Sequence, residues 1–306
     1  MKFNQVNWKS AHSWLRQKQI LLVEVYQKND LEKVRHIQIS ILKDFRTTAI
    51  AVRRVTSTLG SKTPGLDGFV VKTMKERINL ASNVHKIVRT PSSYKPFPVK
   101  RIWIPKKDGT KRPLGIPALL DRAVQAVYLE IIDPLVECNS CENSYGFRKF
   151  RSAQDAVLAL RRKLVHLKAS EWVLNADIVK CFDKINHDFL LRSVPVYRKV
   201  DRNVLKKMLK AKIVDVRDVI ELEEGTPQGG VLSPVFSNIA LNGLEETVKQ
   251  KAVELNKSIM KKVGNPKVHV VRICWRFCSY WTSEKNASSF NSSHWKIFSW
   301  KRFRDF

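Results

Sequence analysis

The chain has 306 residues, 43% of them hydrophobic, which is enough for two domains with cores of their own. Its 56 lysines and arginines outnumber its 28 acidic residues, so the formal net charge is +28. An excess this large predicts a polyanionic partner, because each phosphate that a cationic side chain neutralises releases a condensed counterion. The charge alone leaves RNA, DNA and anionic lipid open, and a basic surface that serves only solubility is the alternative.

The same composition argues against several classes of protein. No run of about 18 apolar residues occurs, so we expect no transmembrane helix. The N-terminus lacks both the apolar core of a secretory signal and the Arg and Ser content of an import sequence. Five cysteines, an odd number, indicate a reducing compartment. Cys138 and Cys141 have CxxC spacing without a second pair or a histidine at zinc-site spacing, so we interpret them as free thiols.

The predicted elements begin with two basic amphipathic helices in residues 5–56, where apolar residues recur at helical spacing between lysines and arginines. A loop at 60–68 is indicated by its Pro-Gly and Asp-Gly pairs. The later elements follow from alternation, helical periodicity and turn residues. They are, in chain order, a hairpin of strands 99–104 and 112–116 with its turn at 107–110, helices 121–133 (ended by Pro134) and 153–167, strand 172–178, helices 187–193 and 204–210, a hairpin at 213–222 and a long helix at 234–251.

The composition changes abruptly at residue 273. The final 34 residues contain no Leu, Val, Gly or Pro, yet hold four of the eight tryptophans and seven serines. A segment of this kind has no regular apolar period with which to dock on a core. We therefore expect 273–306 to have no packed place beside the rest of the fold and to leave its aromatic side chains exposed or loosely held.

An acidic turn follows the predicted strand 172–178. DNA or RNA synthesis is an in-line phosphoryl transfer that uses two Mg²⁺ ions about 4 Å apart, held by carboxylates. Mg²⁺ keeps oxygen ligands and several waters, so a polymerase needs only a few aspartates at strand ends. Asp177 lies at such a place, although an aspartate that ends a strand is, taken alone, more often a solvated turn residue.

A second string is more specific than a generic loop. Its adjacent glycines permit a close backbone approach to a ligand, and its last two residues begin a helix whose amides face the loop. The alternative is an ordinary glycine-rich turn. The string is Gly225-Thr226-Pro227-Gln228-Gly229-Gly230-Val231-Leu232-Ser233-Pro234.

Seven strings together resemble the reverse transcriptase family of group II intron-encoded proteins, in the family's order and over about 40–272. The strings are 64–68, 101–106, 111–117, 121–125, 144–148, 177–183 and 226–234. The resemblance implies an α+β right-hand polymerase with fingers and a ferredoxin-like palm, and with the thumb absent. It divides the chain into a basic helical N-terminal extension (1–60), fingers (61–150), an incomplete palm (151–272) and an out-of-frame tail (273–306).

The resemblance also implies roles for residues of the acidic turn. Asp177 would be the first catalytic and metal-binding carboxylate, with Mg²⁺ as the cofactor, and the carbonyl of Ile178 would lie beside the metal. Phe182 would sit under the deoxyribose and exclude a 2′-hydroxyl. Without the resemblance, Phe182 is equally well explained as a core residue.

Four further residues would bind the incoming nucleotide. By the same resemblance Gln228 and Gly229 would line its pocket, and Lys111 and Arg112 on the hairpin would contact the triphosphate. Lys111 and Arg112 have the alternative of a solvated hairpin. We expect Asp177, the turn at 225–230 and the hairpin at 107–112 to line one cleft.

The resemblance fails after Arg272. The family continues Tyr-Ala-Asp-Asp-Phe, whose aspartate completes the metal pair, whereas residues 273–282 contain no carboxylate. Synonymous codons exist for 273–282 that, with the first base dropped, encode Tyr-Ala-Gly-Asp-Phe-Val-Val-Thr-Gly. Trp275 forces the glycine at the third position, except in a code where TGA means tryptophan, which also permits aspartate. We therefore hypothesise a one-base frameshift between Arg272 and Ile273.

The leading functional hypothesis is the reverse transcriptase domain of a group II intron-encoded protein, an RNA-directed DNA polymerase by family that is inactive as written. Its expected partners are intron RNA, a DNA primer or target and a dNTP, without a membrane. The alternatives are a non-catalytic, maturase-like RNA-binding splicing cofactor and a decayed reading frame. We expect an organelle that encodes the gene (chloroplast or mitochondrion) or bacterial cytoplasm. Primer extension and intron-RNA affinity on one preparation would separate the two functions.

Overall fold

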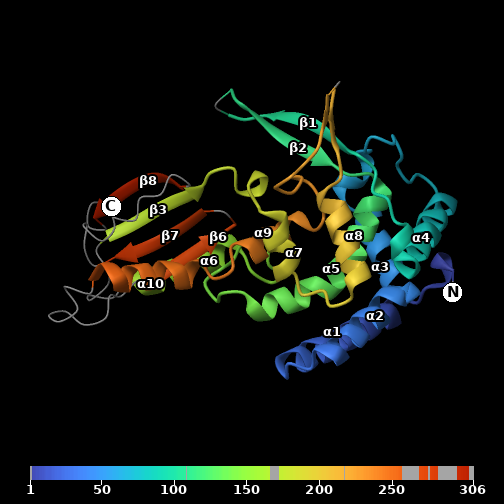
Figure 1. The fold of residues 1–306 in the computed structure, drawn as a ribbon, viewed down its shortest axis with the longest axis horizontal. Helices are drawn as coiled ribbons and strands as arrows, with labels where there is room; N and C mark the ends of the chain where they lie inside the picture. Colours follow the sequence, from blue (N-terminus) through green and yellow to red (C-terminus); the bar gives the residue numbers. More distant parts are fainter. Residues whose placement is uncertain are drawn as a thin grey trace. The chain divides into compact units, whose positions relative to one another are not determined.

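The computed structural model describes residues 2–107, 109–165, 172–216, 218–256, 269–274, 276–281 and 295–302. The chain divides into two compact units, each built from two stretches (Figure 1). Unit 1 is Met1–Cys138 with Phe182–Phe236, and unit 2 is Asn139–Cys181 with Ser237–Phe306. The predicted domain boundaries at 60, 150 and 272 stay predictions. None of the described helices is long and apolar enough to cross a membrane.

Three helices, rather than the predicted two, form the N-terminal part of unit 1. They are α1 (Trp8–Gln27), α2 (Leu31–Lys43) and α3 (Phe45–Thr56). Two aspartates explain the extra break. The carboxylate of Asp30 accepts from the Lys33 amide at the start of α2, and that of Asp44 accepts from the Arg46 amide at the start of α3. Each carboxylate satisfies an amide that has no partner within its helix, so a new helix begins there.

Helix α5 (Leu119–Asn139) forms the centre of the unit 1 core. The predicted helix at 121–133 is correct in type but wrong at both ends, because α5 begins at Leu119 and continues through Pro134. The proline removes one backbone hydrogen bond. Burial of the neighbouring Ile131, Ile132 and Leu135, all without exposed surface, outweighs that loss.

Both stretches of unit 1 contribute further helices. They are α4 (Met74–Arg89), α7 (His187–Ser193) and α8 (Lys199–Leu209). The short 3-10 helices are η1 (Phe3–Gln5), η2 (Leu59–Lys62) and η3 (Pro91–Ser93). A fourth, η4 (Cys181–Asp183), lies where the second stretch of unit 1 begins. The prediction of α7 is confirmed, and α8 begins before the predicted residue 204. Helix α4 was not predicted, although a capping box between Thr73 and Glu76 marks its start.

The sheet of unit 1 joins two hairpins in the order β2-β1-β4-β5. Strands β1 (Val99–Pro105) and β2 (Lys111–Ile116) form the first hairpin, and β4 (Ile213–Asp215) and β5 (Asp218–Ile220) form the second. Both hairpins were predicted and are confirmed. Strand β1 runs parallel to β4, so residues more than 100 positions apart form one sheet.

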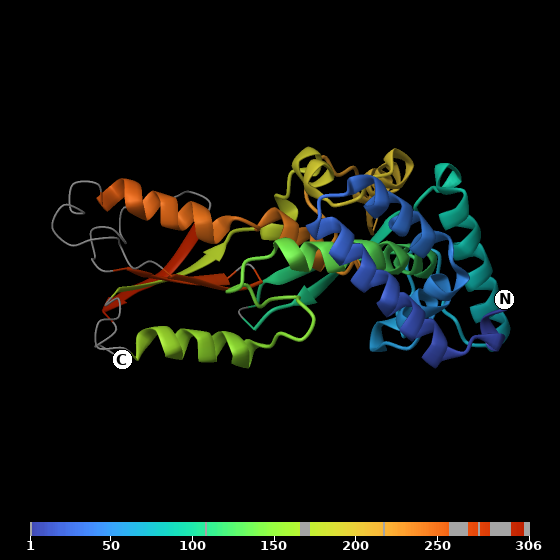
Figure 2. The same cartoon turned by 90° about the horizontal axis from the view of Figure 1, so that it is seen from below.

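Unit 2 is a four-stranded antiparallel sheet with helices. The strands are β3 (Trp172–Ile178), β6 (His269–Ile273), β7 (Arg276–Trp281) and β8 (Trp295–Arg302), in the order β6-β7-β3-β8. Helix α6 (Ala153–Leu164) and helix α10 (Leu244–Asn256) both contact β6 and run beside the strands (Figure 2). The predicted long helix 234–251 is wrong, because α9 (Ser233–Ala240) ends before Gly243, which has φ +85°.

The structure corrects one expectation about residues 273–306. We expected no packed place for this segment, whereas β7 pairs with both β6 and β3, and β8 pairs with β3. The reason is that strands pair through backbone hydrogen bonds, for which Trp, Phe, Tyr and Ile are as suitable as Leu and Val. Ser279 of β7 has no exposed surface. The compositional argument for a frameshift is thereby weakened, and the codon argument stands apart from it.

Candidate nucleotide and metal site

The loop that begins at Gly225 is tied to the segment that follows the acidic turn. Its amide donates to the carbonyl of Ile185 at 2.7 Å, and the Thr226 amide donates to the carbonyl of Phe182 at 2.8 Å. Gly225 has φ +85°, and a Cβ there would lie 2.8 Å from the Asp183 carbonyl oxygen. Only glycine fits both conditions. The loop and residues 182–185 therefore form one structural element.

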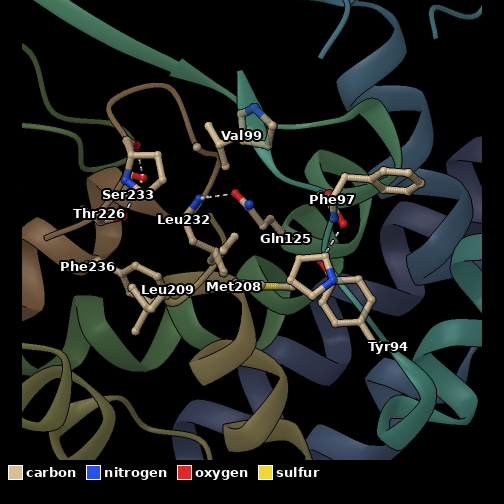
Figure 3. Close-up of a pocket in the computed structure, with 16 residues that line it drawn as sticks. Tyr94, Phe97, Val99, Gln125, Met208, Leu209, Thr226, Leu232, Ser233 and Phe236 are labelled. Atoms are coloured by element: carbon tan, nitrogen blue, oxygen red, sulfur yellow. Dashed lines mark hydrogen bonds between the residues drawn. The ribbon is translucent and has the colours of Figure 1, made fainter. Parts of the chain in front are cut away.

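Side chains fix the rest of the loop. The Thr226 and Ser233 hydroxyls are 2.9 Å apart, and the Ser233 hydroxyl donates to the Pro227 carbonyl at 2.7 Å. From α5, Gln125 Oε1 accepts from the Val231 amide at 2.7 Å and from the Leu232 amide at 3.4 Å, and Figure 3 draws the second of these bonds. The strings 121–125 and 226–234 thus belong to one site, although about a hundred residues separate them. Gln125, which holds the loop, was not among the predicted site residues.

The same region contains a small, mostly apolar pocket beside α5. Tyr94, Phe97, Met208 and Leu232 line it together with Asp121 (Figure 3). Asp121 was predicted to begin the helix, but its carboxylate instead accepts from the Tyr94 hydroxyl at 2.6 Å and from the Phe97 amide at 2.9 Å. Burial raises the pKa of Asp121 to about 6 in spite of these donors. We assign Asp121 a structural role.

The loop meets the first hairpin at two glycines. The Gly115 amide of β2 donates to the Gln228 carbonyl at 2.7 Å. Gly229 has φ +122°, and a Cβ there would lie 2.4 Å from the Gly115 carbonyl oxygen. This close approach requires glycine at 229. The backbone of Gln228 is therefore held against β2, with its side chain partly exposed.

A cleft of about 110 Å³ opens where the loop meets the hairpin. Gln228 lines it together with Arg101, Asp183 and Glu224, so it has charges of both signs. Glu224 also forms an ion pair with Lys184 at its edge. Arg101 and Asp183 lie within the strings 101–106 and 177–183, but neither was predicted as a site residue. Their position in this cleft could not be inferred from local spacing.

The other predicted nucleotide-binding residues of unit 1 lie at different depths. Lys111 and Arg112 are exposed at the start of β2, about 10–13 Å along the strand from Gly115 at ~3.3 Å per residue. They lie on the same strand as Gly115, which lines the cleft. Phe182 is 9% exposed, so its ring is largely covered, while its carbonyl holds the loop.

A buried arginine organises the string at 64–68. Arg122 of α5 donates to the carbonyls of Gly60 and Thr63 at 2.8 and 2.7 Å, and burial lowers the pKa of this arginine. A Cβ on Gly65 would lie 2.7 Å from Ala118 Cα. The loop at 60–65 is therefore packed directly on the start of α5. These contacts join the string 64–68 to the string 121–125.

In unit 2 the string 144–148 supports the turn between β6 and β7. The buried guanidinium of Arg272 donates to the Ser144 hydroxyl at 2.6 Å and to the Cys274 carbonyl at 3.1 Å. A Cβ on Gly146 would lie 2.0 Å from the Cys274 amide nitrogen. Residues 144–146 therefore fix the place where the family's second acidic box would lie.

Asp177 and Ile178 end β3 in unit 2 and are half-buried. In the sheet, Asp177 is paired with Arg276 of β7 and with Lys296 of β8. No group of three His, Cys, Asp or Glu residues within the described parts of the chain could hold a metal ion. A two-metal site needs more than one carboxylate. Residues 273–282, where the family's second acidic box would lie, contain none. Because Asp177 and the 225–233 loop belong to different units, a common cleft stays a prediction.

Comparison with known proteins agrees with the resemblance in the sequence. The family model described as reverse transcriptase (RNA-dependent DNA polymerase) matches residues 104–271, and the N-terminal domain of reverse transcriptase matches 3–84. Protein YkfC of Escherichia coli (strain K12) is 34% identical over 209 residues, which cover 66% of this chain and 54% of that protein. The group II intron-encoded protein LtrA of Lactococcus lactis subsp. cremoris is 30% identical over 222 residues, covering 70% of this chain and 35% of LtrA.

Among solved structures, a partial Cas6-RT-Cas1–Cas2 complex matches with a TM-score of 0.46 and 16% identity, over 80% of this chain and 38% of that one. The chain spans about half the length of YkfC and about a third of LtrA. The family models together cover most of residues 3–271, including the 225–233 loop and Asp177. The chain therefore belongs to the reverse transcriptase family and contains a domain of the kind found in group II intron-encoded proteins.

Proposed function

We propose that this chain binds structured RNA and a deoxynucleoside triphosphate through unit 1, as the fingers and part of the palm of a reverse transcriptase, and does not complete DNA synthesis. One observation supports the proposal most strongly. The hairpin that carries Lys111 and Arg112 is bonded to the loop that carries Gln228. A triphosphate needs cationic side chains, and a base needs a shaped polar pocket.

In this proposal the cleft beside Gln228 takes the nucleotide. Gln228 and Gly229 would contact the base and sugar, and Phe182 would limit the space for a 2′-hydroxyl. Lys111 and Arg112 would reach the phosphates as the hairpin bends over them. Arg101 would add a further cation at the cleft wall. The family uses a divalent metal, and Asp177 with the Ile178 carbonyl would be its first ligands if a second carboxylate were present.

Among the possible polyanions, the names of the relatives support RNA as the partner of this chain. They include a protein encoded by a group II intron, and they come from bacteria and yeasts. We infer that intron RNA is the partner of this chain and that it acts in bacterial cytoplasm or in an organelle that encodes it. The net charge of +28 supports the affinity for RNA but not its specificity.

Nucleotide binding tests the proposal on the chain as it exists. A fluorescent dNTP should bind the wild type, and K111A/R112A should weaken that binding on the order of tenfold through lost charge-assisted contacts. The control K86A/R89A removes the same charge from exposed positions on α4. Equal losses in both variants would contradict a specific triphosphate site.

RNA binding separates this proposal from a splicing cofactor without nucleotide binding. The affinity of the wild type for structured RNA should fall steeply with salt, because several phosphates are neutralised. A chain that binds RNA in this way but gives the fluorescent dNTP no measurable affinity would favour the splicing cofactor.

A further inference from the structure

A buried histidine contacts the first residue of the 225–233 loop. His187 begins α7, is 4% exposed, and its Nε2 lies 2.6 Å from the carbonyl oxygen of Gly225. A carbonyl oxygen can only accept, so Nε2 carries a hydrogen and donates to it. Within the described residues, the buried Nδ1 has no hydrogen-bond partner. The hydrogen bond to Gly225 is therefore the polar contact that orients this imidazole.

This hydrogen bond acts on a peptide group that is also held at its other end. The carbonyl of Gly225 and the amide of Thr226 belong to one planar peptide group. The carbonyl accepts from His187, and the amide donates to the Phe182 carbonyl at 2.8 Å. Gly225 has φ +85° and no Cβ, so its own backbone opposes rotation of the peptide group only weakly. The two hydrogen bonds therefore set the orientation of this group.

The orientation of that peptide group determines how Phe182 is attached to the loop. The neighbouring contact, in which the Ile185 carbonyl accepts from the Gly225 amide at 2.7 Å, involves a different peptide group. If the group between Gly225 and Thr226 rotated, its amide would turn away from the Phe182 carbonyl, while the contact of Ile185 could remain. The hydrogen bond from His187 opposes that rotation.

We propose that His187 is a positioning residue for sugar selection, because its hydrogen bond to Gly225 fixes the peptide group that holds Phe182 beside the loop. This inference rests on the proposed function, in which Phe182 limits the space for a 2′-hydroxyl and Gln228 lines the same nucleotide site. Without the bond, the place of Phe182 relative to Gln228 is less well defined. Ribonucleotides are then excluded less well, whereas the affinity for RNA does not depend on this bond.

The test compares dATP with ATP as competitors of the fluorescent dNTP on the full chain. The wild type should bind dATP more tightly than ATP. H187L removes the donor, so the ratio of the ATP Kd to the dATP Kd should fall about fivefold, the size of one net hydrogen bond. H187Q, whose side-chain amide also donates, should keep the ratio within about twofold of the wild type. The control H36L makes the same substitution at an exposed position of α2 and should leave the ratio unchanged.

A second measurement does not depend on nucleotide binding. In heteronuclear NMR of the histidine ring nitrogens, the signal that H187Q removes should belong to the Nε2–H tautomer. An Nδ1–H ring could not donate to the Gly225 carbonyl from Nε2, so that tautomer would overturn the inference. This measurement decides if H187L does not fold.

Two results of the nucleotide assay would overturn the inference and leave the proposed function intact. One is a folded H187L that keeps the wild-type ratio, and the other is an equal loss in H187L and H187Q. A wild type that binds ATP as tightly as dATP would instead contradict the role of Phe182, and with it the proposed function on which the inference rests.

Discussion

The 225–233 loop of unit 1 and the sheet around Asp177 in unit 2 are held together by different kinds of bond. The loop depends on particular side chains, since Gln125, Thr226 and Ser233 each bond a defined partner. Strand β3 is held to β7 and β8 by a backbone ladder, which most side chains tolerate. A sheet can therefore keep its strand pairing when its side chains change, whereas the loop would lose its conformation if Gln125, Thr226 or Ser233 were replaced.

The largest effect should come from the closest backbone approach in the loop. Gly229→Ala places a Cβ 2.4 Å from the Gly115 carbonyl oxygen, at a φ of +122° that alanine rarely adopts. We expect a loss of about 3–4 kcal/mol in the free energy of unfolding, from strain and from the displaced hairpin. Chemical denaturation measures it.

The control for this substitution lies in the same unit. Gly60→Ala meets no atom within 4 Å and has no positive φ. It should change the free energy of unfolding by less than about 0.5 kcal/mol. If both alanine variants behave alike, the contact between loop and hairpin does not exist in solution.

A second test concerns pH and the buried carboxylate beside the loop. Burial raises the pKa of Asp121 to about 6 in the folded chain, whereas an unfolded aspartate has about 3.9. Protonation therefore stabilises the folded state, fully below about pH 4, and this contribution is lost as the pH rises through about 6. When the pH is lowered from 7 to 4, the free energy of unfolding of the wild type should rise by about 2 kcal/mol relative to that of D121N.

Asp155, an exposed carboxylate that caps α6, should give a pH dependence of stability opposite to that of Asp121. Hydrogen bonds from the Ser152 hydroxyl and amide lower the pKa of Asp155 at the start of α6. Its contribution is present above the pKa of an unfolded aspartate and is lost as the pH falls through the lower, folded value. The wild type should therefore lose stability relative to D155N on acidification. A gain in both comparisons would show that the pH response has another origin.

A smaller effect is expected where one side chain holds the loop. Gln125→Ala leaves the Val231 amide without its acceptor at 2.7 Å, in a partly buried position. The free energy of unfolding should fall by about 1–2 kcal/mol. Binding of a fluorescent dNTP should also weaken, because Gln228 is then less well held. Gln154→Ala, at an exposed position of α6 in unit 2, is the control and should leave both quantities unchanged. A stability loss without any change in nucleotide binding would separate the loop from the proposed site.

Local signals in the sequence predicted the elements that local forces determine. Alternation and turn residues predicted both hairpins of unit 1, and β3 and α7 were predicted with their observed bounds. Helix α5 was misjudged because tertiary burial outweighs Pro134, an effect that no local rule contains. Strands β7 and β8 were missed because their partner is β3, about a hundred residues away.

The site shows the same limit. The individual strings were visible, but the bonds that join Gln125 to Val231 and Gly115 to Gln228 are tertiary, and spacing along the chain cannot reveal them. The pairing of Asp177 with Arg276 was equally hidden. What the sequence did contain was the absence of any carboxylate from residues 273–282.

Primer extension by the 306-residue chain tests the central claim most directly. With an RNA template, a DNA primer, all four dNTPs and Mg²⁺, the wild type should yield no extended product, because residues 273–282 contain no second carboxylate for the metal pair. The chain should bind the same template and primer in the same preparation. Robust synthesis that Asp177→Ala abolishes would contradict the account, since the second carboxylate would then have to come from elsewhere.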